Sequence, residues 1–109
     1  MYIIGRHDPS ILLGFIVSSR SYHKGTALDK EAVVIPRQAT AIFSQESYIQ
    51  CFHEVERLDV NQIANGIANG KISHEGLLKT AYLYKVKEVV KDSDVLSQQD
   101  INDCLAALP

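Results

Sequence analysis

The sequence lacks the features that mark several large classes of protein. Its 11 Lys and Arg stand against 13 Asp and Glu, a net charge of -2, so no overall positive field draws the chain to nucleic acid or anionic lipid. The longest apolar run, residues 11–17, is far shorter than the roughly 18 residues of a membrane-spanning helix. The N-terminus has no charged segment followed by a long apolar one. We therefore expect a soluble, cytoplasmic protein that does not enter a membrane.

Cysteine and histidine are too sparse to indicate a site by their spacing. Cys51 and Cys104 lie in apolar surroundings far apart in the sequence, without a CxxC pair. Buried, reduced thiols are the simpler interpretation, and a single disulfide is the alternative. The 4 histidines show no metal-ligand spacing, and the sequence contains no Gly-rich phosphate loop or nucleophile motif. We expect neither a metal nor a cofactor.

The composition is that of an ordinary globular domain. Of the 109 residues, 46% are hydrophobic and 22% are charged. A chain of this length buries roughly two thirds of its unfolded surface, enough for a core without metal or disulfide. We expect one domain over residues 1–109, rich in strands over 1–58 and helical over 59–109.

The first half predicts strands, because β-branched and aromatic residues fall in short runs between polar loops. Residues 11–17 are almost continuously apolar, as in a strand buried on both faces. Residues 47–58 form the longest candidate, with large apolar side chains on both faces, which indicates packing on both sides or a bulge near Phe52. The other predicted strands cover residues 2–5, before a turn over 6–10, and residues 31–35 and 41–43.

The second half predicts helices, because the apolar period changes from two to about 3.6 after Asp59. Asp59 is suited to cap a short helix that carries Ile63 and Ile67 on one face and ends at Gly70. A second helix is predicted over residues 75–91. Ser97 and Asp100 resemble a capping box before a third, short amphipathic helix.

The polar segment after residue 17 is the strongest candidate site. Ser18, Ser19, Arg20, His23 and Lys24 bring hydroxyls, a guanidinium, an imidazole and an ammonium within seven positions. Cations hold phosphate oxygens, and an imidazole moves a proton near neutral pH, so this set suits phosphodiester chemistry without a metal. The alternative is a loop that is polar because it is exposed.

Other polar residues carry simpler explanations. Arg37, just after Pro36, is either a nucleic-acid contact or an exposed loop charge. The run of residues 6–8 is either a histidine oriented by a carboxylate or a turn. The lysines of residues 75–91 form either a basic stripe against RNA or a solvated face, since acidic residues interrupt them.

Four segments together resemble the second half of the MazF/PemK-like toxin family. They are residues 32–36, 41–43, 45–49 and 55–59, and the resemblance covers about 90 residues of hydrophobic spacing. In the family an acidic residue and a serine begin a long strand that ends near an Arg and an Asp before a helix. Ser47, Arg57 and Asp59 match that outline, with one extra residue between Ser47 and Arg57.

The resemblance implies a fold and an activity. The expected fold is α+β: a small Src-homology-like β-barrel, or a strongly bent antiparallel sheet, followed by two to three C-terminal helices. Active family members are homodimeric, metal-independent endoribonucleases that cleave single-stranded RNA and are neutralised by an antitoxin. Ser18 and Ser19 fall where the family lines its RNA site with a Thr or Ser.

The family's opening strand and its Gly-x-Arg-Pro loop have no counterpart before Tyr2, so the match is to an N-terminally shortened member. In the active version we expect Arg20 to clamp phosphate, His23 to act as acid or base and Ser19 to position the scissile group. Ser18, Lys24 and Arg37 are then RNA contacts. The alternative is a non-catalytic small-barrel module that binds a protein partner.

Overall fold

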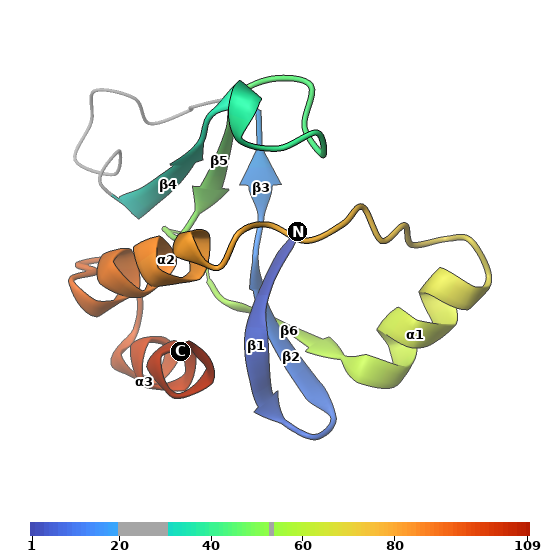
Figure 1. The fold of residues 1–109 in the computed structure, drawn as a ribbon. Helices are drawn as coiled ribbons and strands as arrows, with labels where there is room; N and C mark the ends of the chain where they lie inside the picture. The colour runs from blue at the N-terminus through green and yellow to red at the C-terminus, as the bar shows by residue number, and fades with distance from the viewer. Residues whose placement is uncertain (20–30, 53) are drawn as a thin grey trace.

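The structure is a computed structural model that describes residues 1–19, 31–52 and 54–109. Its strands form two antiparallel three-stranded sheets, ordered β1-β2-β6 and β3-β5-β4, and three helices follow them in the chain (Figure 1). The elements are β1 Tyr2–Asp8, β2 Ile11–Phe15, β3 Val17–Ser18, β4 Ala32–Ile35, the short 3-10 helix η2 Arg37–Ala39, β5 Ser47–Gln50, β6 Glu56–Asp59, α1 Val60–Ala68, α2 Ala81–Lys91 and α3 Gln98–Ala107. The α+β class, with strands first and helices last, is confirmed.

The described strands form no closed barrel, so the expected small barrel is not found in this part of the chain. The two sheets are instead joined by bends. β2 and β3 are separated by Ile16 alone, and each pairs with a different partner: β2 with β6, and β3 with β5. The single strand predicted over residues 47–58 is wrong for the same reason, because a turn at Cys51 and Phe52 divides it into β5 and β6.

The hairpin of β1 and β2 extends further than the sequence predicts. Its pairing continues to Asp8 and Ile11, so the turn consists of Pro9 and Ser10 rather than residues 6–10. The Asp8 carboxylate accepts hydrogen bonds from the backbone N–H groups of Ser10, at 2.8 Å, and Ile11, at 3.0 Å. This side chain stabilises the turn, because it accepts from the N–H groups of the two residues that follow Pro9, as in an Asx turn.

The predicted helix caps agree with the structure better than the predicted helix lengths do. The Asp59 carboxylate accepts from the N–H groups of Asn61 and Gln62, and Ser97 Oγ accepts from Asp100 N at 3.1 Å. Gly70 takes the expected left-handed conformation, with φ 79°. The helix predicted over 75–91 begins only at Ala81, and Gly76, at φ 135°, lies outside helical geometry. Residues 41–43 form no strand.

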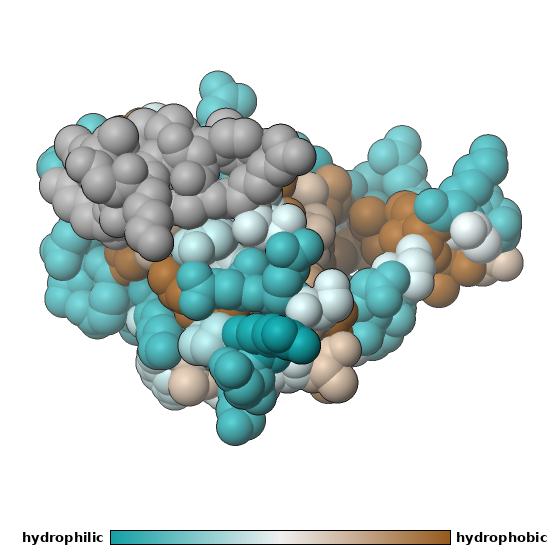
Figure 2. Space-filling view, turned by 90° about the horizontal axis from the view of Figure 1, so that it is seen from above, coloured by the Kyte–Doolittle hydropathy of each residue, from teal (hydrophilic) through white to brown (hydrophobic). Residues whose placement is uncertain are grey.

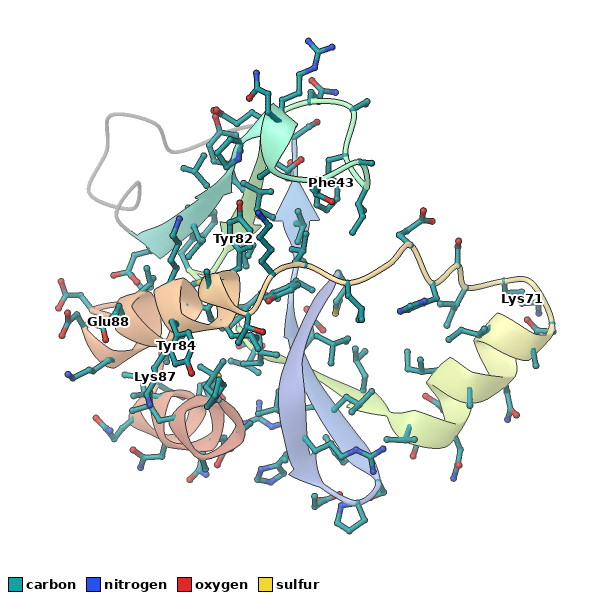
Figure 3. The ribbon with its side chains drawn as sticks, viewed as in Figure 1. Phe43, Lys71, Tyr82, Tyr84, Lys87 and Glu88 are labelled. Carbon is teal, nitrogen blue, oxygen red and sulfur yellow. The ribbon has the colours of Figure 1, made fainter. Side chains whose placement is uncertain are left out.

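The core lies between the sheets and the pair α2 and α3. The chain following α2 returns so that α2 and α3 lie together, whereas α1 projects on the other side (Figure 1). Lys87 of α2 donates to the carbonyl oxygen of Pro109 at 2.8 Å (Figure 3). The buried apolar residues are Ile4, Leu13, Phe15, Val33, Ile35, Ile49, Cys51, Val55, Tyr82, Val86, Val90, Cys104 and Leu108.

Candidate functional site

The predicted site residues that the structure describes gather at one end of the β3-β5-β4 sheet. β5 is antiparallel to both of its neighbours. The end of β3, the start of β5 and the end of β4 therefore lie at the same end of the sheet (Figure 1). Ser18 ends β3, Ser19 follows it, and Arg37 comes two residues after β4. Three of the six predicted site residues are therefore brought together by strand pairing.

The register also fixes which side chains share a face of this sheet. Ser18 pairs with Tyr48, and Tyr48 pairs with Val34, so these three residues form one row on one face. The neighbouring row faces the core, because Ile49 and Val33 are both buried. Val34 is 43% exposed. Ser18 and Tyr48 therefore lie on the outer face, away from the core.

Tyr48 is a candidate site residue that the sequence did not single out. Its hydroxyl donates to Glu46 Oε1 at 2.6 Å, which fixes the phenol near the start of β5. A partly exposed aromatic ring on the outer face of a sheet is a surface on which a nucleotide base can stack. Little in the sequence points to Tyr48 as a site residue, because only the register with β3 and β4 assigns it to the outer face.

Arg37 lies in the exposed helix η2, directly after Pro36. Its guanidinium forms no ion pair with any residue that the structure describes. A guanidinium at the end of a sheet can bind phosphate oxygens in a bidentate manner. The remaining predicted site residues, Arg20, His23 and Lys24, lie outside the described residues.

A second polar cluster joins α3 to the β1-β2-β6 sheet. Arg57 Nη2 donates to Asp103 Oδ2 at 2.6 Å and to Asp100 Oδ1 at 3.0 Å. The Asp103 carboxylate also accepts from Gln99 and lies 4.0 Å from His7 Nδ1. The nearby guanidinium lowers the pKa of Asp103, and the two carboxylates raise the pKa of Arg57.

This cluster is suited to hold a helix rather than a ligand. Two carboxylates already neutralise the Arg57 guanidinium, so little positive charge remains for an anion. The sequence predicts only part of this cluster. The spacing of Asp100 and Asp103 places them on one helix face, but Arg57, which binds both, lies more than 40 residues before them. The histidine is also oriented differently from the sequence alternative, because the Asp8 carboxylate binds the turn and His7 faces Asp103 instead.

The two cysteines are free and buried in the core. Burial raises the pKa of both thiols, and for Cys104 the value is about 12. Both side chains are therefore neutral thiols at physiological pH and poor nucleophiles. The predicted buried thiols are confirmed, and the alternative of a disulfide is wrong.

Two further observations concern the described ranges alone. Within residues 1–19, 31–52 and 54–109, no group of three or more His, Cys, Asp or Glu side chains is arranged to hold a metal ion. Nor does any helix in these ranges have the length and apolar character needed to cross a membrane.

Comparison of the chain with models of known protein families, with curated proteins and with solved structures gives no match.

Proposed function

We propose that the chain is a MazF/PemK-like, toxin-type endoribonuclease that binds single-stranded RNA on the outer face of the β3-β5-β4 sheet. The observation that carries the proposal is the convergence of Ser18, Ser19 and Arg37 at one end of that sheet, beside Tyr48. These are a hydroxyl pair, a guanidinium and an aromatic ring, the groups that single-stranded RNA sites combine.

In the proposed site, each described residue binds a different part of the RNA. The Tyr48 ring stacks on one base, and the Ser18 hydroxyl binds a ribose or phosphate oxygen next to it. Arg37 binds the backbone phosphate beyond the end of β4. Because base stacking is tolerant of sequence, this face by itself confers affinity rather than a strict target sequence.

The proposed reaction needs no metal. The 2′-oxygen of one nucleotide attacks the adjacent phosphorus, and the bond from phosphorus to the 5′-oxygen of the next nucleotide breaks. His23 either takes the 2′-hydroxyl proton or supplies a proton to the leaving 5′-oxygen, and water makes the other proton transfer. Arg20 stabilises the negative charge that develops on the non-bridging phosphate oxygens. Ser19 positions the scissile phosphate. In the sequence, these three residues lie within five positions after Ser18, the last residue of β3.

Incubation with a mixed single-stranded RNA in EDTA tests the proposal. We expect discrete cleavage by the unmodified protein, loss of cleavage in Arg20→Ala, and weaker RNA binding in Arg37→Ala. Arg6→Ala is the matched control, because it removes one exposed guanidinium from β1, in the other sheet, and changes the net charge equally. Its cleavage and binding should be unchanged.

The possible results separate the alternatives. RNA binding that depends on Arg37 without any cleavage would restrict the proposal to a non-catalytic RNA-binding protein. RNA that is neither bound nor cleaved would reject it. Equal losses in Arg6→Ala and Arg37→Ala would show a general charge effect and would also reject the proposed face.

A second candidate function, binding of an antitoxin or another protein partner, is favoured by the apolar surface of the projecting region. Leu77 is 86% exposed, and Ile67 of α1 and Ile72 are also exposed. Figure 2 shows apolar surface on this part of the molecule, at the right of the view. Co-purification with the product of an adjacent gene should be lost in Leu77→Ser and kept in Arg37→Ala if this function holds.

A further inference from the structure

The end of α1 and the turn after it contain the same four residues twice, because residues 63–70 read Ile-Ala-Asn-Gly and again Ile-Ala-Asn-Gly. Each copy has an asparagine followed by a glycine, first Asn65 and Gly66 and then Asn69 and Gly70. Such a pair is prone to deamidation, because glycine lacks the side chain that keeps a backbone nitrogen away from the preceding asparagine side chain. The sequence therefore offers two equivalent sites, and only the structure distinguishes them.

The first site lies inside α1. The backbone N–H of Gly66 is part of the helical hydrogen-bond ladder, which directs it along the helix axis and away from the Asn65 side chain. Gly66 is also buried, because the Ile72 side chain packs against it and Ile72 N donates to its carbonyl oxygen at 2.9 Å. Attack by the Gly66 nitrogen therefore requires several helical hydrogen bonds and one apolar contact to open together.

The second site lies at the C-cap of α1, where Asn69 and Gly70 are both exposed. Asn69 has left helical geometry, with ψ 4°, and Gly70 N donates to the Ile67 carbonyl oxygen at 3.2 Å. Asn69 Oδ1 accepts from Lys71 N at 3.0 Å. This hydrogen bond folds the amide side chain over the Gly70 nitrogen, which lies between the two groups in the chain. Little movement is therefore needed to bring the nitrogen to the side-chain carbonyl carbon.

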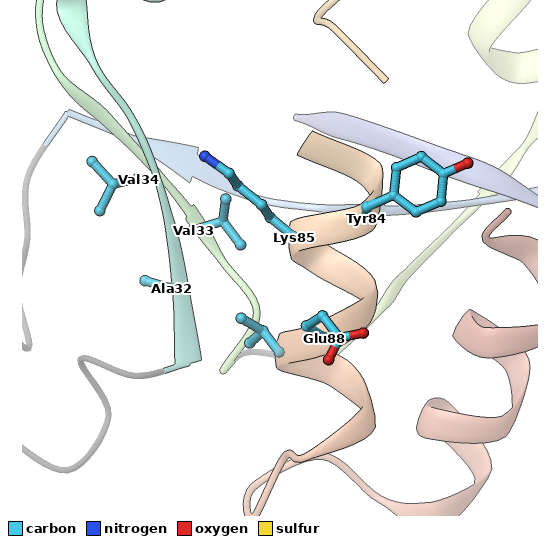
Figure 4. Close-up of a pocket in the computed structure, with 7 residues that line it drawn as sticks. Ala32, Val33, Val34, Tyr84, Lys85 and Glu88 are labelled. Atoms are coloured by element: carbon cyan, nitrogen blue, oxygen red, sulfur yellow. The ribbon is translucent and has the colours of Figure 1, made fainter. Parts of the chain in front are cut away.

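The place of the second site in the fold keeps it in contact with water. Lys71 marks it at the outer end of α1, on the projecting side of the molecule (Figure 3). A groove of about 480 Å³, between β4 and α2, lies on the other side (Figure 1, Figure 4). A molecule bound in that groove, or on the outer face of the β3-β5-β4 sheet, therefore leaves Asn69 accessible.

We propose that Asn69 deamidates spontaneously in the folded protein, whereas α1 protects Asn65. The Gly70 nitrogen loses its proton to hydroxide and attacks Cγ of Asn69, and the new bond from nitrogen to carbon closes a succinimide ring. The bond from Cγ to the side-chain nitrogen breaks, and this nitrogen takes up a proton and leaves as ammonia. The Lys71 N–H stabilises the negative charge on Oδ1 before the ammonia leaves. Water then opens the ring, so position 69 becomes aspartate or isoaspartate without any change of oxidation state.

Both products disturb the end of α1. Each places a negative charge beside the C-terminal carbonyl groups of the helix, which carry partial negative charge, and the last turn of α1 contains no basic residue. Isoaspartate also adds one carbon to the backbone before Gly70, which displaces the N–H groups of Gly70 and Lys71 from their acceptors. Deamidation therefore loosens the turn that brings Ile72 back onto α1.

Mass spectrometry of the aged protein tests the proposal. The purified protein is incubated in a mildly alkaline buffer, and trypsin then releases both asparagines in one peptide, residues 58–71. Fragmentation of that peptide gives the deamidated fraction at each position. We expect deamidation to be at least about tenfold faster at Asn69 than at Asn65 in the folded protein. In urea the two rates should be similar, because both asparagines have the same neighbours over four residues.

Removal of a helix cap separates protection by α1 from general stability. Asp59→Ala removes the carboxylate that accepts from the first N–H groups of α1. It should raise the rate at Asn65 about fivefold and leave the rate at Asn69 within about twofold. Ser97→Ala is the matched control, because it removes the corresponding cap of α3 and should change neither rate. Circular dichroism establishes that both variants are folded.

Three results would overturn the proposal. The first is deamidation of Asn65 that is as fast as that of Asn69, or faster, in the folded protein. The second is an intact Asn69 in the folded protein under conditions in which the urea-denatured protein deamidates. The third is an equal rate at Asn65 with and without the Asp59→Ala substitution, which would show that α1 does not protect this residue.

Discussion

The helices α1 and α3 have similar N-terminal caps but different structural roles. Each has a side-chain cap at its N-terminus, and they contain nine and ten residues. α3 packs on β1 and α2, and both Cys104 within it and Leu108 directly after it are buried. α1 packs mainly on β6, the strand that leads into it, and its only buried residue is Gly66. A cap determines where a helix begins, but distant partners determine whether it belongs to the core.

The difference follows from what each helix can reach. Ile72 contacts Gly66, so the partner of α1 at this position comes from the chain that directly follows the helix. The apolar residues of α3 meet a strand and a helix far away in the sequence, and Arg57 holds its acidic face. Contacts between α1 and the residues next to it in the chain contribute little to the free energy of unfolding, because they are lost together when this region opens locally.

The largest expected effect compares one apolar truncation in each region. Leu108→Ala, at a position 7% exposed, should lower the free energy of unfolding by about 2–5 kcal/mol, because it leaves a cavity beneath α3. Ile67→Ala, at a position 45% exposed on α1, should change it by no more than about 0.5 kcal/mol. Urea denaturation measures both. Equal losses would show that α1 is part of the cooperative core.

A matched pair of glycines gives the next effect. A Cβ atom at Gly5 would lie 2.6 Å from the Ala107 carbonyl oxygen, so Gly5→Ala should displace α3 from β1 and cost about 1–3 kcal/mol. At Gly70 no atom lies within 4 Å, and only the left-handed φ of 79° opposes a side chain. Gly70→Ala should cost about 1 kcal/mol. Thermal denaturation that ranks Gly70→Ala as the worse variant would contradict this order.

The two caps should separate local from global stability. Ser97→Ala should lower the free energy of unfolding by about 1 kcal/mol, because the hydrogen bond to Asp100 N begins a helix that the core requires. Asp59→Ala should accelerate amide hydrogen exchange within α1 and leave the urea midpoint almost unchanged. Slower exchange in α1 than in α3 would refute the distinction.

The smallest effect is the dependence of stability on pH that Arg57 confers. Arg57 lowers the pKa of Asp103 below its ordinary value of 3.8, so the ion pair stabilises the fold above about pH 4 and is lost as the pH falls through the lowered pKa. Arg57→Ala should therefore reduce stability slightly at neutral pH and remove part of the loss at acidic pH. The pKa of Asp8 is also lowered, and its contribution to the pH dependence should be the same in the unmodified protein and in Arg57→Ala. Urea denaturation at pH 3 to 7 measures this, and identical pH profiles would contradict it.

Part of the candidate site could be predicted from the sequence. The residue types of positions 18–24 indicated phosphodiester chemistry, and strand pairing brings Ser18, Ser19 and Arg37 to one sheet end as a site requires. Tyr48 was missed, because side-chain alternation within a strand does not tell which face is the outer one until its partners are known. Arg57 was noticed only through the family resemblance, since nothing near it in the sequence indicates Asp103.

The sequence by itself determined the order of strands and helices, the caps at Asp59 and Ser97, the left-handed Gly70 and the burial of both cysteines. Each depends on interactions within a few residues or on the apolar character of one side chain. The tertiary structure alone decided the two bends that turn predicted single strands into two sheets, the late start of α2, and the unequal roles of α1 and α3. These depend on which distant backbone and side-chain groups meet, and the residues in one segment of the chain do not encode their partners in another.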